Sequence, residues 1–323
     1  MTRSLAFLAA LLLAAISVSS ACIASATDTI SFELKPSMRA GQLQLALSRA
    51  SPHGNNNLSG SSYAWTDFQG LNASVFASTG PVAFAFVREA GRIDCSGTSA
   101  NRIATGTCRF TADPAFANYL ASNGIARPTA EQAFELTVTN ATRGLVDMLA
   151  AYRYPKPSVS DLVTLAALDV TRDYVASLAA AGLRPEALDD LVQFAALHVT
   201  PEFVAGLKRA GYSNLTPNEM VEFKALDISP QFVTSLAAAG YANLSASEVT
   251  QMAALHITPA YIASFANAGF RDLDVNTLVQ LKALDVTPEF VRSLQQHGLY
   301  PRTADQLVKL KAAGFDDPPN SRR

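Results

Sequence analysis

A 29-residue period runs through the second two-thirds of this sequence and constrains the fold more than any other feature. At this spacing two sets of residues fall into register: Gly182, Gly211, Gly240, Gly269 and Gly298, and Leu168, Leu197, Leu226, Leu255 and Leu284. Two residue types that keep one period over five copies are a specific sign of tandem repeats. The shift carried backwards reaches Gly124, with Arg153 as the one exception. We therefore expect a repeat array over residues 113–315.

Each repeat carries the start signal of a first helix. In residues 216–240 (TPNEMVEFKALDISPQFVTSLAAAG), Thr216 suits the N-cap, Pro217 suits the first turn, and Glu219 completes a capping box. Ser245 with Glu248 and Thr303 with Gln306 repeat this box. The apolar side chains of this helix fall on one face, which predicts that one side is buried: Met220, Val221, Phe223 and Leu226.

A second helix begins at Ser229-Pro230, has Phe232, Val233 and Leu236 on its apolar face, and ends at Gly240 in a left-handed cap. Helices of about ten residues do not persist alone in water, so they must be stabilised by their neighbours. The sequence therefore predicts a mainly α-helical fold, an α-solenoid of two-helix, 29-residue repeats.

One column of the repeat resembles a chemical site: Asp169, His198, Asp227, His256 and Asp285 follow the five leucines. A pH-sensitive ladder, a metal-binding stripe or an unrecognised hydrolase with His198 and His256 is one interpretation. Continued in both directions, the column reaches Asn140 and Gly314, and Gly, Asn, Asp and His best tolerate positive φ. We therefore interpret the column as the left-handed turn between the two helices, and we expect no catalytic, metal-binding or cofactor-binding residue in it.

The first 26 residues have the features of a secretory signal. Arg3 precedes an apolar run, and Ala24-Ser25-Ala26 forms a small-residue cleavage site. The alternative is a lipoprotein signal, in which the mature chain would be anchored by a lipid on Cys22. No later stretch is long and apolar enough to span a bilayer, so we expect a mature chain that is periplasmic or secreted and has no transmembrane segment.

Residues 27–112 alternate apolar with polar side chains in several segments: 29–35, 42–47, 82–88, 91–97 and 102–110. This period of two predicts half-buried strands of a small antiparallel sheet. Cys95 and Cys108 fall in the last strand pair, and an even pair of cysteines in an exported chain predicts a disulfide. Residues 316–323 (DDPPNSRR) are expected to be a disordered tail.

The segment 51–62 (SPHGNNNLSGSS) is rich in residues that favour loops. His53, Asn55 to Asn57 and Trp65 could form a sugar-binding loop with an exposed aromatic ring. The alternative is a mobile loop with Trp65 packed on the sheet, which we favour because no charged groups converge there.

Charge and motifs argue against several functions. The segment 113–315 has 15 basic against 20 acidic side chains, which offers no basic field for nucleic acid. The metallopeptidase motif HExxH, the hydrolase motif GxSxG and the phosphate-binding motif GxxxxGK[ST] are missing from the sequence. We therefore expect a protein that is not an enzyme and has no cofactor.

The sequence of the repeat, as in residues 214–240 (NLTPNEMVEFKALDISPQFVTSLAAAG), resembles the helical-repeat tails of some bacterial envelope regulators. Such tails accompany membrane metallopeptidases of the beta-lactam-sensor type and also occur in stand-alone exported proteins. The resemblance covers about residues 113–315 and includes no peptidase motif. It implies a fold and an association with envelope sensing.

These observations together predict an exported scaffold whose array presents a surface to a protein or peptide partner. Candidate contact residues are the variable charged ones: Lys208, Arg209, Glu222, Lys224, Lys282 and Arg292. A module that binds a small ligand or glycan through residues 51–76 is the alternative, with the array as its support.

Overall fold

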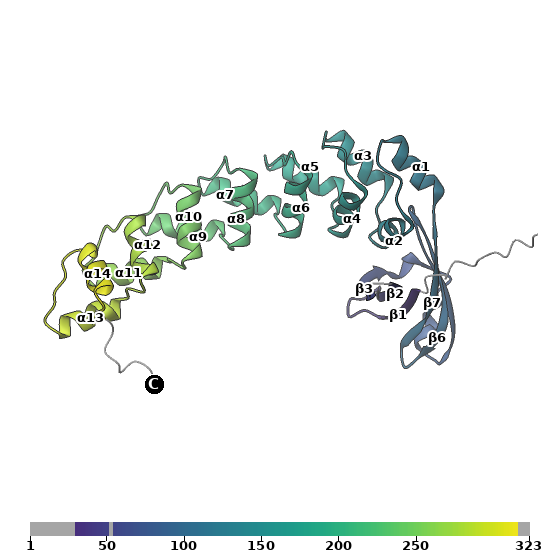
Figure 1. The fold of residues 1–323 in the computed structure, drawn as a ribbon, viewed down its shortest axis with the longest axis horizontal. Helices are drawn as coiled ribbons and strands as arrows, with labels where there is room; N and C mark the ends of the chain where they lie inside the picture. Colours follow the sequence, from purple (N-terminus) through teal and green to yellow (C-terminus); the bar gives the residue numbers. More distant parts are fainter. Residues whose placement is uncertain (1–29, 52–53, 316–323) are drawn as a thin grey trace, which may run out of the picture. The chain divides into compact units, whose positions relative to one another are not determined.

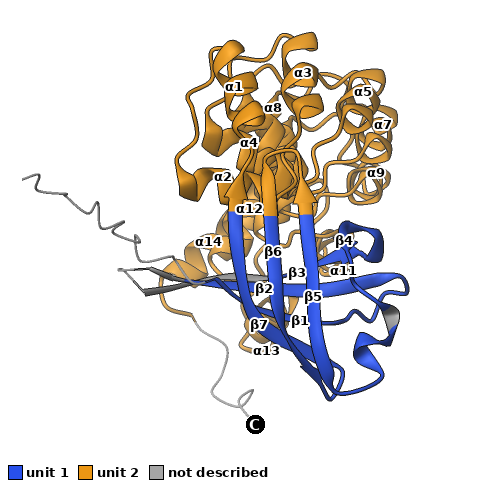
Figure 2. Cartoon of the chain, turned by 90° about the vertical axis from the view of Figure 1, so that its right-hand side faces the viewer, with its two compact units in different colours: residues 1–86, 93–110 blue, residues 87–92, 111–323 orange. Residues whose placement is uncertain are grey.

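The computed structural model describes residues 30–51 and 54–315, and the chain divides into two compact units. We call them the sheet unit (residues 1–86 and 93–110) and the helical unit (residues 87–92 and 111–323), and Figure 2 colours them separately. The expected signal at 1–26 with Cys22, and the expected tail at 316–323, lie outside the described residues.

The predicted antiparallel sheet is confirmed, and it has seven strands within the described residues. They are β1 (Ile30–Pro36), β2 (Gln42–Ser51), β3 (Gly54–Ala64), β4 (Phe68–Gln69), β5 (Gly80–Arg88), β6 (Gly91–Ala100) and β7 (Ile103–Ala112). Their order in the sheet is β3-β2-β1-β7-β6-β5-β4. Short 3-10 helices lie at Trp65–Asp67 and Ala73–Phe76.

Alternation along the strands places the apolar side chains on one face. Ile30, Phe32 and Leu34 of β1 are buried while the residues between them are not. Phe32 lies opposite Leu47 of β2, and its ring meets the edge of Phe84 at a centroid distance of 5.1 Å. The sheet unit therefore owes its core to the period-two pattern.

The expected loop at 51–62 is wrong. Strand β2 continues to Ser51, and β3 pairs with it from Gly54 opposite Ser51 to Ala64 opposite Gln42. Backbone hydrogen bonds do not depend on side chains, and β3 is an edge strand with one paired side, so Gly, Asn and Ser are tolerated there. A bulge between Leu45 and Leu47 adjusts the register of the pair.

The expectation of a mainly helical chain is confirmed, with fourteen α-helices of nine residues each in the described part. The first seven are α1 (Pro114–Ser122), α2 (Ala130–Val138), α3 (Arg143–Ala151), α4 (Val159–Ala167), α5 (Arg172–Ala180), α6 (Leu188–Ala196) and α7 (Pro201–Arg209). The others are α8 (Pro217–Ala225), α9 (Pro230–Ala238), α10 (Ala246–Ala254), α11 (Pro259–Asn267), α12 (Val275–Ala283), α13 (Pro288–Gln296) and α14 (Ala304–Ala312). Each helix from α3 onward begins one sequence period after the helix two places before it.

The helices pack mainly on near neighbours. Every even-numbered helix contacts the next even-numbered one, from α2 to α14, and in the same way α5 contacts α7 and α7 contacts α9. Figure 1 shows the helices following one another in the order of the sequence. The buried side chains form successive clusters, such as the one from Leu178 to Val249, which draw on consecutive helices. Short helices with overlapping cores stabilise one another.

The capping signals are mostly where the sequence places them. Thr216 exchanges both bonds of a capping box with Glu219, since the Glu219 N–H donates to the Thr216 hydroxyl at 3.2 Å and the Thr216 N–H donates to Glu219 Oε2 at 2.8 Å. Ser245 and Glu248 do the same. The box expected at Thr303 is only half formed, because the Gln306 side chain accepts from the Arg302 N–H instead.

Leu226 is not part of the buried face expected for its helix. It is the C-cap of α8 and is 40% exposed, while Met220 and Phe223 are buried and Ile228, in the following turn, is 1% exposed. The helix ends one residue before Leu226, so its side chain leaves the apolar stripe. The buried position that follows α8 is therefore Ile228.

Strand β7 ends at Ala112 and α1 begins at Pro114, with Asp113 between them as N-cap. The Asp113 carboxylate accepts from the Ala115 N–H at 2.7 Å. No helix of the described residues has the length and hydropathy needed to cross a bilayer.

Candidate functional site

The column that resembled a chemical site lies in the tight turns between paired helices. Its members are exposed and have φ between 51° and 54°: Asp169, His198, Asp227, His256 and Asp285. Asn140 and Gly314, at the two ends of the column, have φ of 62° and 84°. Backbone conformation alone accounts for the residue types in this column.

The two histidines of the column face their own helix ends. His198 Nδ1 lies 3.0 Å from the Ala195 carbonyl oxygen, and His256 Nδ1 lies 3.1 Å from the Ala253 carbonyl oxygen. A histidine that donates from Nδ1 to a helix carbonyl satisfies one of the unpaired acceptors at a helix end. Among the described residues, His, Cys, Asp and Glu side chains form no group of three that could hold a metal ion.

The glycine column lies just after the C-terminal ends of the odd-numbered helices. Gly182, Gly211, Gly240, Gly269 and Gly298 have φ between 78° and 101°. Arg153, which interrupts the column, has φ of 61° and so adopts the same left-handed region. A residue with a Cβ atom pays roughly 1 kcal/mol there.

Arg153→Gly is therefore expected to raise the free energy of unfolding by roughly 1 kcal/mol, because it removes this backbone strain. Gly240→Ala, at φ 98° with no atom within 4 Å of the new Cβ, is expected to lower it by a similar amount. Urea unfolding followed by circular dichroism measures both. Equal effects of the same sign from the two substitutions would contradict the assignment.

The predicted disulfide is confirmed. Cys95 of β6 and Cys108 of β7 are joined with a sulfur-to-sulfur distance of 2.03 Å, and their side chains are 4% and 8% exposed. The bridge links two neighbouring strands of the sheet. It closes a loop of chain and so stabilises the sheet mainly by restricting the unfolded state.

Only part of the loop considered for sugar binding can be described. His53 and the side chains of Asn55 to Asn57 lie outside the described residues, and Trp65 is half-buried with its ring against the edge of Phe76 at 6.0 Å. A hollow of about 310 Å³ lies between residues 70 and 83 of the sheet unit, with Asn72, Ser74 and Thr79 among its lining residues. Trp65 is not part of that lining.

The charged residues considered for recognition have several different roles. Arg209, Glu222 and Arg292 are exposed, and Arg292 pairs with Glu289. Lys224 and Lys282 are half-buried, and each Nζ lies 4.8 Å from the centroid of an aromatic ring of the preceding odd-numbered helix, on Phe203 and Tyr261 respectively. A Cβ atom placed on Gly182 would come within 2.3 Å of Lys208 Nζ, so this ammonium lies at the C-terminal end of α5, where a cation is favourable.

Tyrosine hydroxyls link successive segments of the helical unit, which the sequence pattern did not reveal. The Tyr212 hydroxyl donates to the Leu244 carbonyl at 2.6 Å, and Tyr241 donates to Leu273 in the same way, one sequence period further along the chain. The Tyr174 hydroxyl donates to the Val199 carbonyl at 3.0 Å. Burial raises the pKa of Tyr174 to about 12, with a further contribution from Tyr154, and burial followed by the charge of Asp285 raises the pKa of Tyr261 to about 12.

These tyrosines predict a loss of stability in alkali. The unfolded chain releases its phenolic protons near pH 10, while Tyr174 and Tyr261 keep theirs to about pH 12, so stability is full below pH 10 and falls as the pH rises between these values. Urea midpoints measured across that window should fall less steeply in the Tyr174→Phe, Tyr261→Phe double variant. Tyr300→Phe, at a side chain that is 69% exposed, is the matched control, and an equal slope in both variants would contradict the prediction.

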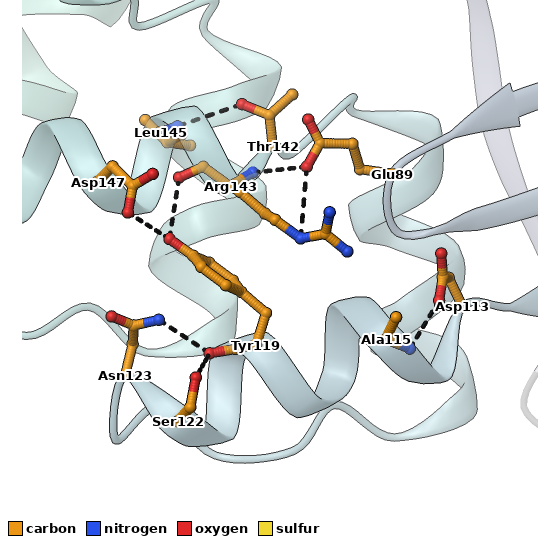
Figure 3. Close-up of polar contacts among 10 residues, drawn as sticks. All are labelled: Glu89, Asp113, Ala115, Tyr119, Ser122, Asn123, Thr142, Arg143, Leu145 and Asp147. Carbon is orange, nitrogen blue, oxygen red and sulfur yellow. Dashed lines mark hydrogen bonds and ion pairs between the residues drawn. The ribbon is translucent and has the colours of Figure 1, made fainter.

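A polar cluster holds residues 87–92 against the first helices of the helical unit (Figure 3). The Arg143 N–H at the start of α3 donates to Glu89 Oε2 at 3.0 Å, and Arg143 Nε lies 3.9 Å from the same oxygen. The Tyr119 hydroxyl donates to the Asp147 carboxylate, and the Arg143 guanidinium lies 5.6 Å from the centroid of the Tyr119 ring. A carboxylate at a helix N-terminus complements the helix dipole.

This cluster has a structural role. Beside it Ala90 is 2% exposed in the same apolar cluster as Phe116 and Leu120, and the Asp113 N–H donates to the Ala90 carbonyl at 3.0 Å. Burial, followed by the hydrogen bond to Asp147, raises the pKa of Tyr119 to about 12, so its hydroxyl is a neutral donor at physiological pH. Residues 87–92 therefore pack against α1 and the start of α3. A contact between positions 54 residues apart leaves no local signal in the sequence.

The even-numbered helices present an exposed surface on which the same residue types recur. We call it the even-helix face and define it by three rows of residues. They are Gln193, Glu222, Gln251 and Gln280; Ala167, Ala196, Ala225, Ala254 and Ala283; and Leu168, Leu197, Leu226, Leu255 and Leu284. The first two rows are exposed, and the leucines are half-buried except Leu226 and Leu284, which are 40% and 38% exposed. Residues three and four positions apart lie side by side on a helix, so the rows run next to one another.

Comparison of the chain with protein families, with curated proteins and with solved structures gave no match.

Proposed function

We propose that this chain is an exported, non-enzymatic repeat protein that acts as a scaffold for a protein or peptide partner, as an accessory of envelope sensing. The observation that supports this most is the even-helix face, on which exposed Gln and Ala side chains recur from helix to helix beside half-buried or exposed leucines. Residues that stabilise a fold are buried, whereas exposed positions are free to vary unless something contacts them. Recurrence at exposed positions therefore supports a function for that surface.

We also propose that the helical unit is a solenoid of 29-residue repeats. Equal helix lengths, starts at regular intervals and contacts between each even-numbered helix and the next all support this arrangement. Solenoids expose a long surface for their size and are commonly used to bind other proteins. The disulfide supports a location in an oxidising compartment, which for an exported chain is the periplasm or the exterior of the cell.

Removal of two whole repeats tests the scaffold function. Deletion of residues 188–245 joins Ala187 to Ala246 and keeps the periodic order of the helices, since it removes α6 to α9 as two complete periods. Tagged full-length and shortened proteins are crosslinked in the cells that produce them and purified by the tag. We expect at least one crosslinked protein to depend on the deleted repeats. An identical set from both proteins, or no adduct from either, would contradict the proposal.

A second candidate is a glycan-binding role for the sheet unit, and the polar hollow lined by Asn72, Ser74 and Thr79 favours it. Amide and hydroxyl groups suit hydrogen bonds to sugar hydroxyls. Titration calorimetry with soluble cell-wall fragments tests this role. Saturable heat that Asn72→Ala abolishes and the 188–245 deletion leaves intact would favour this function over the scaffold, and no heat would exclude it.

A further inference from the structure

We propose that the even-helix face is a docking surface for an extended, cationic peptide segment that presents an apolar side chain at every third residue. This inference rests on the proposed scaffold function and names the class of partner. It follows from the spacing, the constant small residues and the charge of the surface.

The spacing of the leucine row sets the conformation of the partner. Successive even-numbered helices are in contact, and packed helices lie about 8–10 Å apart, so the leucines recur at about this distance. An extended or polyproline-type chain advances about 3.1–3.3 Å per residue, or about 9–10 Å in three residues. A peptide lying across the even-numbered helices therefore meets one leucine of the row with every third side chain.

The alanine row provides room for close approach. The last residue of α4, α6, α8, α10, α12 and α14 is alanine in each case, and all six are exposed. The last residue of the odd-numbered helices varies in type. In α5, α7, α9, α11 and α13 it is Ala180, Arg209, Ala238, Asn267 and Gln296. Helix termination thus does not require alanine. A small residue beside the glutamine row, on the side away from the leucines, allows a second backbone to come close to the helix.

The row of Gln193, Gln251 and Gln280 borders the alanines and is exposed. A carboxamide both donates and accepts, so it can bond to the N–H and to the carbonyl of an extended backbone whatever the peptide sequence. The Gln251 side chain donates to the Ser247 hydroxyl at a long distance of 3.4 Å. This row therefore supplies partners for the backbone groups of the peptide, while the leucines contact its side chains.

The charge of the even-numbered helices selects a cationic partner. Counted through the turn that follows each helix, the segments 159–169, 188–198, 217–227, 246–256 and 275–285 contain nine acidic and two basic residues. The corresponding odd-numbered segments, 172–182, 201–211, 230–240, 259–269 and 288–298, contain three acidic and four basic residues. The two basic residues of the even-numbered segments, Lys224 and Lys282, have their ammonium groups over Phe203 and Tyr261. An excess of acidic side chains on these helices attracts lysine and arginine.

A labelled synthetic peptide that repeats Leu-Lys-Pro is the probe, because proline favours the extended conformation and leucine falls at every third residue. Fluorescence anisotropy measures its binding to the complete protein. We expect saturable binding, and binding weaker by about tenfold or more for a Leu-Glu-Pro repeat and for a peptide of the same composition with its leucines grouped.

Ala225→Arg combined with Ala254→Arg places two bulky cations on the even-helix face. This double variant is expected to weaken binding of the Leu-Lys-Pro peptide by about tenfold or more. Ala180→Arg with Ala238→Arg adds the same charge at the equivalent exposed position of α5 and α9, where α7 already has Arg209, and is expected to change binding less than about twofold. Circular dichroism checks that both variants remain folded.

Absence of saturable binding, equal binding of the three peptides, or equal effects of the two double variants would overturn the proposal. Failure of this proposal can be distinguished from failure of the scaffold function. If the 188–245 deletion removes a crosslinked partner while the Leu-Lys-Pro peptide does not bind, the function stands and the peptide surface does not.

Discussion

Phe223→Ala is expected to lower the free energy of unfolding of the helical unit by about 4 kcal/mol, the largest effect of any single substitution that we foresee in its helices. The Phe223 side chain is fully buried in the cluster that runs from Leu178 to Val249, and its ring packs near Tyr212 at a centroid distance of 5.6 Å. Truncation removes apolar contacts and leaves a cavity that neighbouring helices cannot fill without losing their own contacts.

Leu226→Ala is the matched control on the same helix. Leu226 is 40% exposed, so its truncation is expected to cost only roughly 1 kcal/mol. Hydrogen exchange measures the local effect, and we expect amides of α6 to α10 to lose protection in Phe223→Ala while strand amides of the sheet unit keep theirs. A loss of protection spread evenly over all helices would contradict packing limited to near neighbours.

Gly97→Ala is expected to lower the stability of the sheet unit by roughly 3 kcal/mol or more. A Cβ atom on Gly97 would lie 2.0 Å from the Thr105 carbonyl oxygen and 2.7 Å from the Gly106 Cα. Both neighbours are backbone atoms of β7, so the clash cannot be relieved by turning a side chain. Strands β6 and β7 would have to separate at the pair that also contains the disulfide between Cys95 and Cys108.

Gly80→Ala is the control for this substitution, because a Cβ atom there would meet nothing within 4 Å. Its effect is expected to stay within about 1 kcal/mol. Thermal unfolding measures the stability of both variants, and a separate assay measures the rate at which the disulfide is reduced. Faster reduction is expected for Gly97→Ala alone. Equal behaviour of the two variants would show that β6 and β7 are not in close contact at Gly97.

The helices could be predicted because their signals are local. N-cap residues, prolines in the first turn and left-handed residues after the last turn each act within a few positions, and the repetition shows them several times over. The strand β3 was missed for the opposite reason. Its pairing with β2 depends on backbone groups brought together by the fold, and its Gly, Asn and Ser residues carry a turn signal.

The same distinction explains what could be known of the site. The column of Asp169 and His198 was interpreted from residue types alone, since positive φ selects a small set of residues. The contact of Glu89 with Arg143 and the bond from Tyr212 to Leu244 join distant positions, so no local pattern indicates them. Exposure of the alanine row also needed the structure, because alanine at the end of a helix is ordinary in a sequence.

A photoreactive amino acid placed at single exposed positions tests most directly whether the helical unit is the interaction surface. It would replace Ala225 of the even-helix face, Ala238 of an odd-numbered helix, and Ala77 of the sheet unit, one at a time, in cells that produce the protein. All three side chains are exposed, so each protein should fold. We expect a light-dependent adduct with another protein from position 225, and a weaker adduct or none from positions 238 and 77. Adducts from position 77 alone, or none from position 225, would contradict the account.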